Sequence, residues 1–220
     1  MTESQSSRDK ILDVAEALFA QRGYAGVGLR QVAAAAGLVK SSLFHHFRSK
    51  DQLYAEVLGR VLARIRERLD PVLESGADPA RKLDRWVDAL IDALAEHPTT
   101  ARLLLRGLFE EDDFRADPVP EAEEVDETIA AILDGIQRLL KEGVDAGAFR
   151  AVSVPHTVQT LIGATVYHFA SGELGEGLLG RPLLSAEAVR RRKQELGDLL
   201  HHGIAGAGRP RVQSASEGRS

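Results

Sequence analysis

Apolar residues recur along this 220-residue chain at intervals of three and four, which is the spacing of one face of an α-helix. The first run is Ile11, Val14, Ala15, Leu18 and Phe19, and Gly23 ends it. Similar runs continue almost to residue 204, and no segment alternates in the manner of a half-buried strand. The sequence therefore predicts an all-α protein, and its 44% apolar content is enough for a sizeable core.

The absence of cysteine excludes disulfides, zinc–thiolate sites, iron–sulfur clusters and thiol nucleophiles. Residues 1–7 are polar, and no run of about 18 apolar residues occurs. We therefore expect a cytoplasmic protein with no secretion signal and no membrane span. The chain has no HExxH or ExxH pair, and His156 and His168 would lie about 120° apart around a helix. The sequence thus predicts neither a metal site nor a cofactor.

Charge is distributed unevenly along the chain. The net charge is −5, yet residues 1–50 hold seven Lys and Arg against four acids, and residues 17–50 hold no acid at all. The remaining 170 residues carry a charge of −8. A surface without a charged partner usually mixes both signs, so this pattern favours an anionic partner at the N-terminal end.

The N-terminal part predicts a compact three-helix unit. Short helices are expected at residues 29–36 and 40–47, with a turn at Gly37 between them. Ser49 and Gln52 predict a capping box that opens a long helix ending at Pro71, and this helix would bridge two domains. We expect a disordered N-terminus over residues 1–7 and a compact helix-turn-helix domain over residues 8–52.

The rest of the chain predicts a second helical domain over residues 53–204. Helices are expected at residues 79–96, where Asp78-Pro79 gives a good start, and at 100–109, 125–147, 156–170 and 186–204. The acid-rich, proline-containing residues 110–126 predict a mobile connector, and Gly172 to Gly180 predict a glycine-rich loop. Residues 205–220, rich in Gly, Ser and Arg, predict a disordered tail.

The segment from Gln31 to Phe44 carries the pattern of two short helices that cross steeply. Such a pair needs small residues where the helices touch, a glycine in the turn and apolar residues behind the exposed helix. Ala33, Gly37, Leu43 and Phe47 fit these roles. With Gly23-Tyr24, Leu43-Phe44-His45-His46-Phe47 and Ser49-Lys50, the region from Arg8 to Leu58 resembles the DNA-binding domain of the TetR family of bacterial regulators.

This resemblance implies a helical homodimer whose two heads read a double-stranded DNA operator and whose C-terminal domain binds a small-molecule effector of unknown identity. Lys40 and Ser42 would contact bases or phosphates, and Lys50 would contact phosphate at the start of the long helix. The DNA-contacting set implied in this way is Arg30, Lys40, Ser41, Ser42, Phe44, His45, His46 and Lys50.

The chain departs from the family pattern at two places. Phe44 stands where the family commonly has a tyrosine, so a hydroxyl that would bind phosphate is missing. Val27-Gly28 stands where the family commonly has Thr or Ser, so a helix cap and a further phosphate contact are missing. We therefore expect fewer backbone anchors, with His45 and His46 supplying polar contacts instead.

Pocket residues in the sensor domain follow from residue types alone. A ligand pocket between helices is apolar with a few polar groups, and ordinary core packing would give the same pattern. The candidate wall residues are Trp86, Leu90, Leu104, Leu108, Phe109, Ile132, Ile136, Leu161, Thr165 and Phe169. The polar candidates for an anionic or hydrogen-bonding ligand are His97, Arg102, Arg106, Tyr167 and His168.

The two C-terminal helices, at residues 156–170 and 186–204, carry apolar faces suited to a four-helix dimer interface, although these faces would also serve packing within one chain. We expect a repressor released by its ligand, with an activator or a ligand-requiring repressor as the alternative. An enzyme is disfavoured because no GxSxG, P-loop or metal motif occurs. A protein-interaction module is disfavoured by the basic, acid-free stretch before Asp51.

Overall fold

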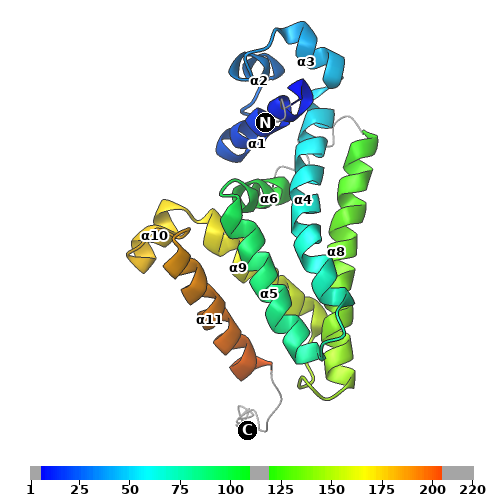
Figure 1. The fold of residues 1–220 in the computed structure, drawn as a ribbon, viewed down its shortest axis with the longest axis vertical. Coiled ribbons are helices and arrows are strands. Elements are labelled where there is room, and N and C mark those ends of the chain that lie inside the picture. Colours follow the sequence, from blue (N-terminus) through cyan, green and yellow to red (C-terminus); the bar gives the residue numbers. More distant parts are fainter. Residues whose placement is uncertain (1–5, 110–118, 205–220) are drawn as a thin grey trace, which may run out of the picture.

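The computed structural model describes residues 6–109 and 119–204. In these ranges ten helices form a small N-terminal head on a larger helical body (Figure 1). The head consists of α1 (Ser7–Arg22), α2 (Leu29–Ala35) and α3 (Lys40–His46). The predicted all-α fold, with its helix-turn-helix head and helical C-terminal domain, is confirmed.

The body is built around α4 (Lys50–Glu74), which runs from the head down the molecule and contacts α5 (Pro79–Glu96) and α8 (Pro120–Asp145) (Figure 1). The short helix α6 (Thr100–Phe109) contacts both α1 and α9 (Val154–Ala170). The last two helices are α10 (Glu173–Leu179) and α11 (Ala186–Gly203), and α11 packs against α5. No helix of the described ranges is both long and apolar enough to cross a bilayer.

Local sequence signals account for most helix ends. The Asp78 side chain accepts a hydrogen bond from the Arg81 N–H at 3.1 Å, and Pro79 follows at the first helical position of α5. The Ser49 hydroxyl accepts from the Gln52 N–H at 3.1 Å, but the Gln52 side chain accepts from the Arg48 N–H rather than from Ser49. The predicted capping box is thus shifted by one residue on its return bond.

Three predicted boundaries were wrong. Residues 120–126 are helical, because Pro120 starts α8 and Glu121 and Glu123 place negative charge in its first turn. The glycine-rich segment contains α10, with positive φ confined to Gly172 and Gly180 at its two ends. Helix α4 continues past Pro71 to Glu74, since proline removes one hydrogen bond without preventing a final turn.

The chain ends also bear on the predictions. Ser6 caps α1 and Ser7 begins it, although both were expected in a disordered N-terminus. Residues 1–5, 110–118 and 205–220, which include most of the predicted connector and the predicted tail, lie outside the described residues.

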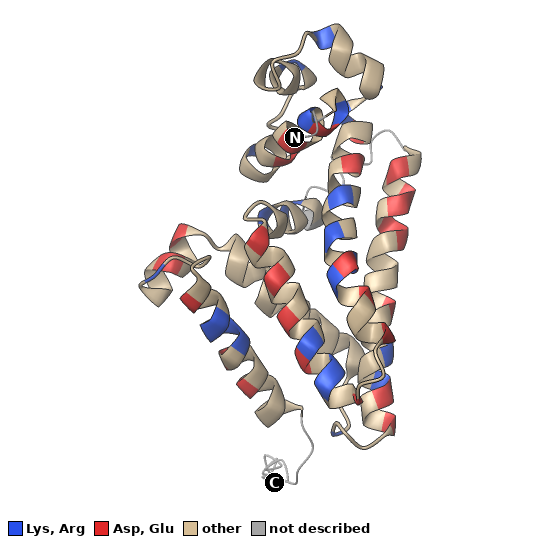
Figure 2. Cartoon of the chain, in the orientation of Figure 1, with Lys and Arg blue, Asp and Glu red and all other residues tan. Residues whose placement is uncertain are grey.

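Charge is also distributed unevenly over the surface of the body. Figure 2 shows Asp and Glu gathered on the half of α8 nearest the head, while Lys and Arg occupy the middle of the neighbouring α4. The Gln52 side chain bridges the two helices by donating to the Glu121 carboxylate at 2.8 Å. The head end of the body therefore has an acidic side and a basic side.

Candidate DNA-binding head and sensor domain

The turn between α2 and α3 has the geometry that the small residues predicted. Ala33, Leu43 and Phe47 are buried, and Gly37 adopts a φ of 68°, a conformation that costs little only for glycine. The Leu38 N–H donates to the Ala33 carbonyl at 2.9 Å and closes the turn. The orientation of α3 relative to α2 is thus fixed by the core of the head.

Helix α3 presents its polar residues to solvent. Lys40, Ser41 and His45 are exposed, Ser42 and His46 are half-buried, and Phe44 is 40% exposed. The Lys40 ammonium lies 5.0 Å from the centre of the Phe44 ring, so the phenyl group supports the lysine rather than filling the core. Six of the predicted DNA contacts therefore lie on one short helix, with Leu43 as its buried anchor.

The remaining two predicted contacts flank α3. Arg30 is exposed near the start of α2, which Gly28 begins without a side-chain cap; the Gln31 amide oxygen reaches back to the Gly28 N–H at 3.5 Å. Lys50 starts α4 with its ammonium 3.9 Å from the centre of the Tyr24 ring. The Tyr24 hydroxyl in turn donates to Asp51 at 2.6 Å, which holds the ring in place beneath the lysine.

Val39 is a surface residue that the sequence analysis missed. It directly precedes α3 and is 67% exposed, although it is large and apolar. An exposed apolar side chain beside a recognition helix is suited to contact the methyl group of thymine. The sequence did offer a signal for this exposure. The buried residues that anchor α3, Leu43 and Phe47, lie further along the chain, so Val39 before the helix is not needed for the core.

A buried carboxylate joins the head to the body, and sequence reasoning did not single it out. Glu16 on α1 accepts hydrogen bonds from Arg60 at 3.0 Å, Arg64 at 2.7 Å and the Thr99 hydroxyl at 2.7 Å. Burial alone would raise the pKa of Glu16, but the hydrogen bonds from Arg64, Thr99 and Arg60 outweigh it and lower that pKa. One ionised group therefore links α1, α4 and the segment that leads into α6.

A second link between head and body comes from α6. Arg106, one of the predicted ligand contacts, donates to the Gln21 carbonyl of α1 at 3.2 Å. Another predicted contact, Arg102, is exposed and lies against Gly172 at the start of α10. Helix α6 is thus in contact with the head at one side and with the α9–α10 corner at the other.

Six of the ten predicted wall residues are buried in the core of this structure. Trp86, Leu90, Ile136, Leu161, Thr165 and Phe169 are buried, whereas Leu104 and Ile132 are half-buried. The Thr165 hydroxyl donates to the Leu161 carbonyl within α9, and the buried Trp86 indole N–H has no hydrogen-bond partner among the residues that the structure describes. Leu108 and Phe109 lie at the end of α6, and their side chains are outside the described part of the chain.

The polar candidates are not brought together. His97 ends α5, and its carbonyl accepts from the Thr100 N–H at 2.9 Å. Tyr167 is 57% exposed on the outer face of α9. His168, next to it, has its Nε2 atom buried without a hydrogen-bond partner, and burial and the nearby charge of Arg192 lower its pKa to about 4. Arg192 on α11 was not predicted.

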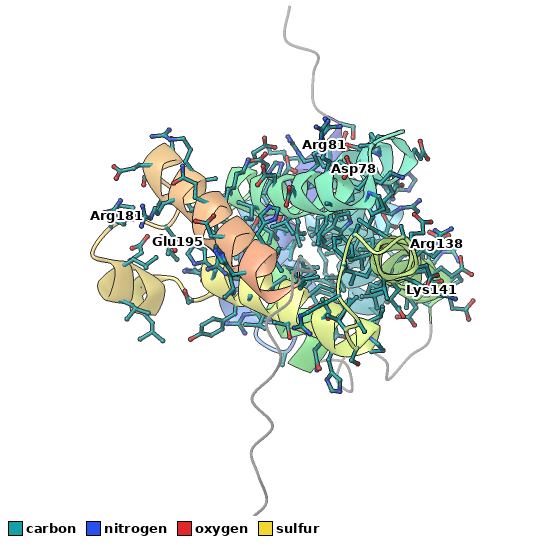
Figure 3. All side chains as sticks on the ribbon, turned by 90° about the horizontal axis from the view of Figure 1, so that it is seen from below. Asp78, Arg81, Arg138, Lys141, Arg181 and Glu195 are labelled. Atoms are coloured by element: carbon teal, nitrogen blue, oxygen red, sulfur yellow. The ribbon has the colours of Figure 1, made fainter. Side chains whose placement is uncertain are left out.

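Two of the hollows in the body lie away from these residues. The larger, of about 870 Å³, lies between α4, α8 and the start of α9 and has a charged lining of both signs. Figure 3 shows Arg138 and Lys141, which line it, pointing outward from α8. The other, of about 280 Å³, lies between α5 and α11. Neither is lined by a predicted wall residue. Among the described residues, no cluster of His, Asp or Glu is suited to hold a metal ion.

Both parts of the chain match known family models. Residues 11–57 match the model of bacterial regulatory proteins of the tetR family, and residues 79–200 match the tetracyclin repressor-like C-terminal domain. The HTH-type transcriptional repressor KstR2 of Mycolicibacterium smegmatis is 30% identical over 149 residues, covering 68% of this chain and 70% of that protein.

Solved structures share the fold. The ketosteroid transcriptional regulator KstR2 of Mycobacterium tuberculosis superposes with a TM-score of 0.75 at 22% identity, over 93% of this chain and 98% of that one. AibR, solved with isovaleryl coenzyme A and operator DNA, superposes with a TM-score of 0.71 at 16% identity, over 88% and 97%. The chain belongs to the TetR family of bacterial regulatory proteins.

Proposed function

We propose that this transcriptional regulator is a homodimeric repressor that binds a palindromic operator through α3 and releases it when a small molecule binds the helical body. The observation that carries the proposal is the exposed polar row of α3, Lys40, Ser41 and His45, on a helix held by buried Leu43 and Phe47. A short, rigidly packed helix with polar side chains facing outward is suited to enter the major groove.

The predicted contacts fall into two groups in this account, those on α3 and those that flank it. Lys40 and Ser42 would contact base edges or phosphates, with His45 and His46 beside them. Arg30 and Lys50 flank α3 and would contact phosphates, Lys50 with the added help of the α4 dipole. Phe44 supports Lys40 rather than binding phosphate itself.

The dimer interface is proposed at the outer face of α9, α10 and α11. Large apolar side chains are exposed there, and a contiguous exposed apolar surface is typical of an interface: Tyr167 57%, Leu174 71%, Leu178 86%, Leu179 45% and Leu199 64%. No atom lies within 4 Å of a Cβ built on Gly163, so a second helix has room to approach α9 closely. Two-headed reading of a palindrome requires such a twofold pairing.

The small molecule would act by a population shift, favouring a dimer whose heads are too far apart for successive major grooves. Two hydrogen bonds would transmit this shift from the body to α1. Arg64 of α4 donates to Glu16, and Arg106 of α6 donates to the Gln21 carbonyl. Since AibR was solved with isovaleryl coenzyme A, acyl-coenzyme A thioesters are the first ligands to test. In an activator or a ligand-requiring repressor, the same head and body would be used, but the effect of the ligand on transcription would be reversed. We infer no enzymatic role, and we place the protein in the cytoplasm with bacterial DNA.

The test is selection of duplexes from a random library, followed by fluorescence anisotropy on the selected sequence across a salt series. We expect tight, sequence-selective binding that weakens steeply with salt, because phosphate contacts release counterions. Replacing Lys40 and Ser42 by alanine together should weaken binding by about 10-fold to 100-fold. Lys141→Ala, at the far end of α8, is the matched control and should bind as the wild type does. If the anisotropy showed no binding to any duplex at any salt concentration, the proposal would be overturned.

A further inference from the structure

Three of the four consecutive cations at residues 190–193 of α11 differ in their partners. Figure 2 shows this basic cluster in the first half of the helix. Arg191 pairs with Glu195 at 2.5 Å, and Lys193 pairs with Asp92 of α5 at 2.7 Å. Arg192, between them, pairs with no carboxylate among the described residues; its Nη2 donates to the Ala164 carbonyl of α9 at 2.9 Å. The middle cation therefore points into the protein, between α9 and α11, without a counterion.

Burial makes this isolation costly. The Arg192 Nε atom is buried and has no hydrogen-bond partner in the described part of the chain, and burial lowers the pKa of the guanidinium. Removing a cation from water without an opposing charge is unfavourable, so proteins rarely leave one in this state. A methionine or leucine would fill the same space at lower cost. The arrangement is explained if an anion binds there.

A second unsatisfied group lies nearby. His168 follows Ala164 by one helical turn on α9, and its buried Nε2 atom has no hydrogen-bond partner within residues 6–109 and 119–204. A neutral imidazole in the Nε2–H tautomer would donate a hydrogen bond to the same anion. Two donors from two helices, each buried and each lacking an acceptor, make a pair complementary to a carboxylate or phosphate.

We propose that Arg192 and His168 form an anion-binding subsite between α9 and α11, which takes the carboxylate or phosphate of the small-molecule effector. This inference rests on the proposed ligand-responsive function. The subsite lies where α9 approaches α6 and α10, and α6 contacts α1 of the head (Figure 1). An anion held there would draw α9 and α11 together directly beside the helix that reaches the head.

The experiment measures the thermal midpoint of the full-length protein at pH 7 and constant ionic strength. Sodium chloride is replaced stepwise by sodium isovalerate or by sodium phosphate. Arg192→Met removes the charge but keeps the length of the side chain, and Arg191→Met is the matched control on the same helix. We expect a saturable rise of several degrees in the wild type and in Arg191→Met, and its loss in Arg192→Met. A general salt effect would act on all three proteins equally.

A second readout does not depend on the folding of a variant. The imidazole ¹⁵N resonances of His168 in the wild type, assigned with His168→Gln, should shift with the same half-saturation as the thermal midpoint. A response to isovalerate alone assigns the subsite to carboxylates, and a response to phosphate alone assigns it to phosphoryl groups. Equal responses of wild type and Arg192→Met, or unchanged His168 resonances with both anions, would overturn the proposal.

Operator binding separates this inference from the function on which it rests. Arg192→Met should bind the selected operator as tightly as the wild type when no anion is added, because α11 is remote from α3 (Figure 1). Loss of the anion response with normal operator binding supports the subsite. Absence of operator binding in the wild type would reject the proposed function, whatever the anion response.

Discussion

The carboxylate of Glu16 on α1 accepts a 2.7 Å hydrogen bond from Arg64 on α4, 48 residues further along the chain. Because Glu16 is buried and also binds Arg60 and Thr99, it is the buried member of the charged contacts that hold α1 of the head against the body. Any movement of α4 or of the segment before α6 must either carry α1 with it or break these bonds. The head position is thus coupled to the body by a group whose loss can be measured.

Glu16→Gln should lower the free energy of unfolding by about 2 kcal/mol, since it leaves two arginines without their shared carboxylate. The matched control is Glu96→Gln, which breaks the exposed pair with Arg68 and should cost well under 1 kcal/mol. Thermal unfolding measures both. The lowered pKa of Glu16 adds a pH signature: its stabilisation is complete above the ordinary value of 4.5 and is lost as the pH falls through the lower folded value. Equal costs for the two variants would contradict this role.

Gly37→Ala should destabilise the head by about 1 kcal/mol, because alanine at a φ of 68° is strained. The nearest atom to the added Cβ is the Lys10 ammonium at 3.8 Å, so strain rather than collision is the cause. Gly197→Ala, within α11 and with no atom within 4 Å, is the control and should raise the stability instead. A Gly37→Ala protein as stable as the wild type would refute the fixed turn.

Leu178→Lys should convert the dimer to monomers, since a lysine ammonium would be buried in the apolar contact proposed for α9, α10 and α11. Leu178 is 86% exposed in the single chain, so the substitution leaves the fold intact. Sedimentation velocity measures the assembly state, and circular dichroism checks the helix content. Ile129→Lys, on the exposed face of α8, should remain dimeric. A monomeric wild type would reject the interface outright.

His168 predicts a loss of stability in mild acid. Its pKa falls from the ordinary 6.5 to about 4 in the folded protein, first through burial and then through the charge of Arg192. The unfolded chain therefore binds more protons between these two values, and stability falls as the pH drops through that window.

After allowance for the partial exposure of the ring, we expect a loss of about 1 kcal/mol between pH 7 and pH 5, or roughly 2–4 °C in the thermal midpoint. His168→Gln should remove this part of the pH dependence, whereas His202→Gln, exposed on α11, should not. A wild type and a His168→Gln variant with parallel pH profiles would show that His168 keeps an ordinary pKa.

The head could be predicted in detail because its signals are local. Ala33, Gly37 and Leu43 lie within eleven residues, and a turn, a small contact and an anchor suffice to define two crossing helices. The body helices were also predicted from their periodicity, and their ends from caps such as Asp78-Pro79. Two predictions failed because they used residue composition and ignored position within the segment. The glycines of positive φ around α10 lie only at its two ends, and the acids after Pro120 stabilise the first turn of α8.

Long-range partners could not be predicted. Glu16 has the sequence context of any exposed helical acid, and only the fold brings Arg60, Arg64 and Thr99 to it. Arg192 stands in an ordinary basic run, and its difference from Arg191 and Lys193 lies in which carboxylates α5 and α11 offer. The pocket wall stayed undecided for the same reason, since a core residue and a ligand contact have the same sequence pattern.

The most direct test of the account is a hydroxyl-radical footprint of the wild-type protein on its selected operator. Two linked copies of α3 predict two symmetric protected half-sites, with centres one helical turn or about 34–36 Å apart, or a multiple of that distance. Both should vanish together when Lys40 and Ser42 are replaced by alanine. A single asymmetric protected patch, or protection that survives the double replacement, would contradict the central claim that this chain reads DNA as a dimer through α3.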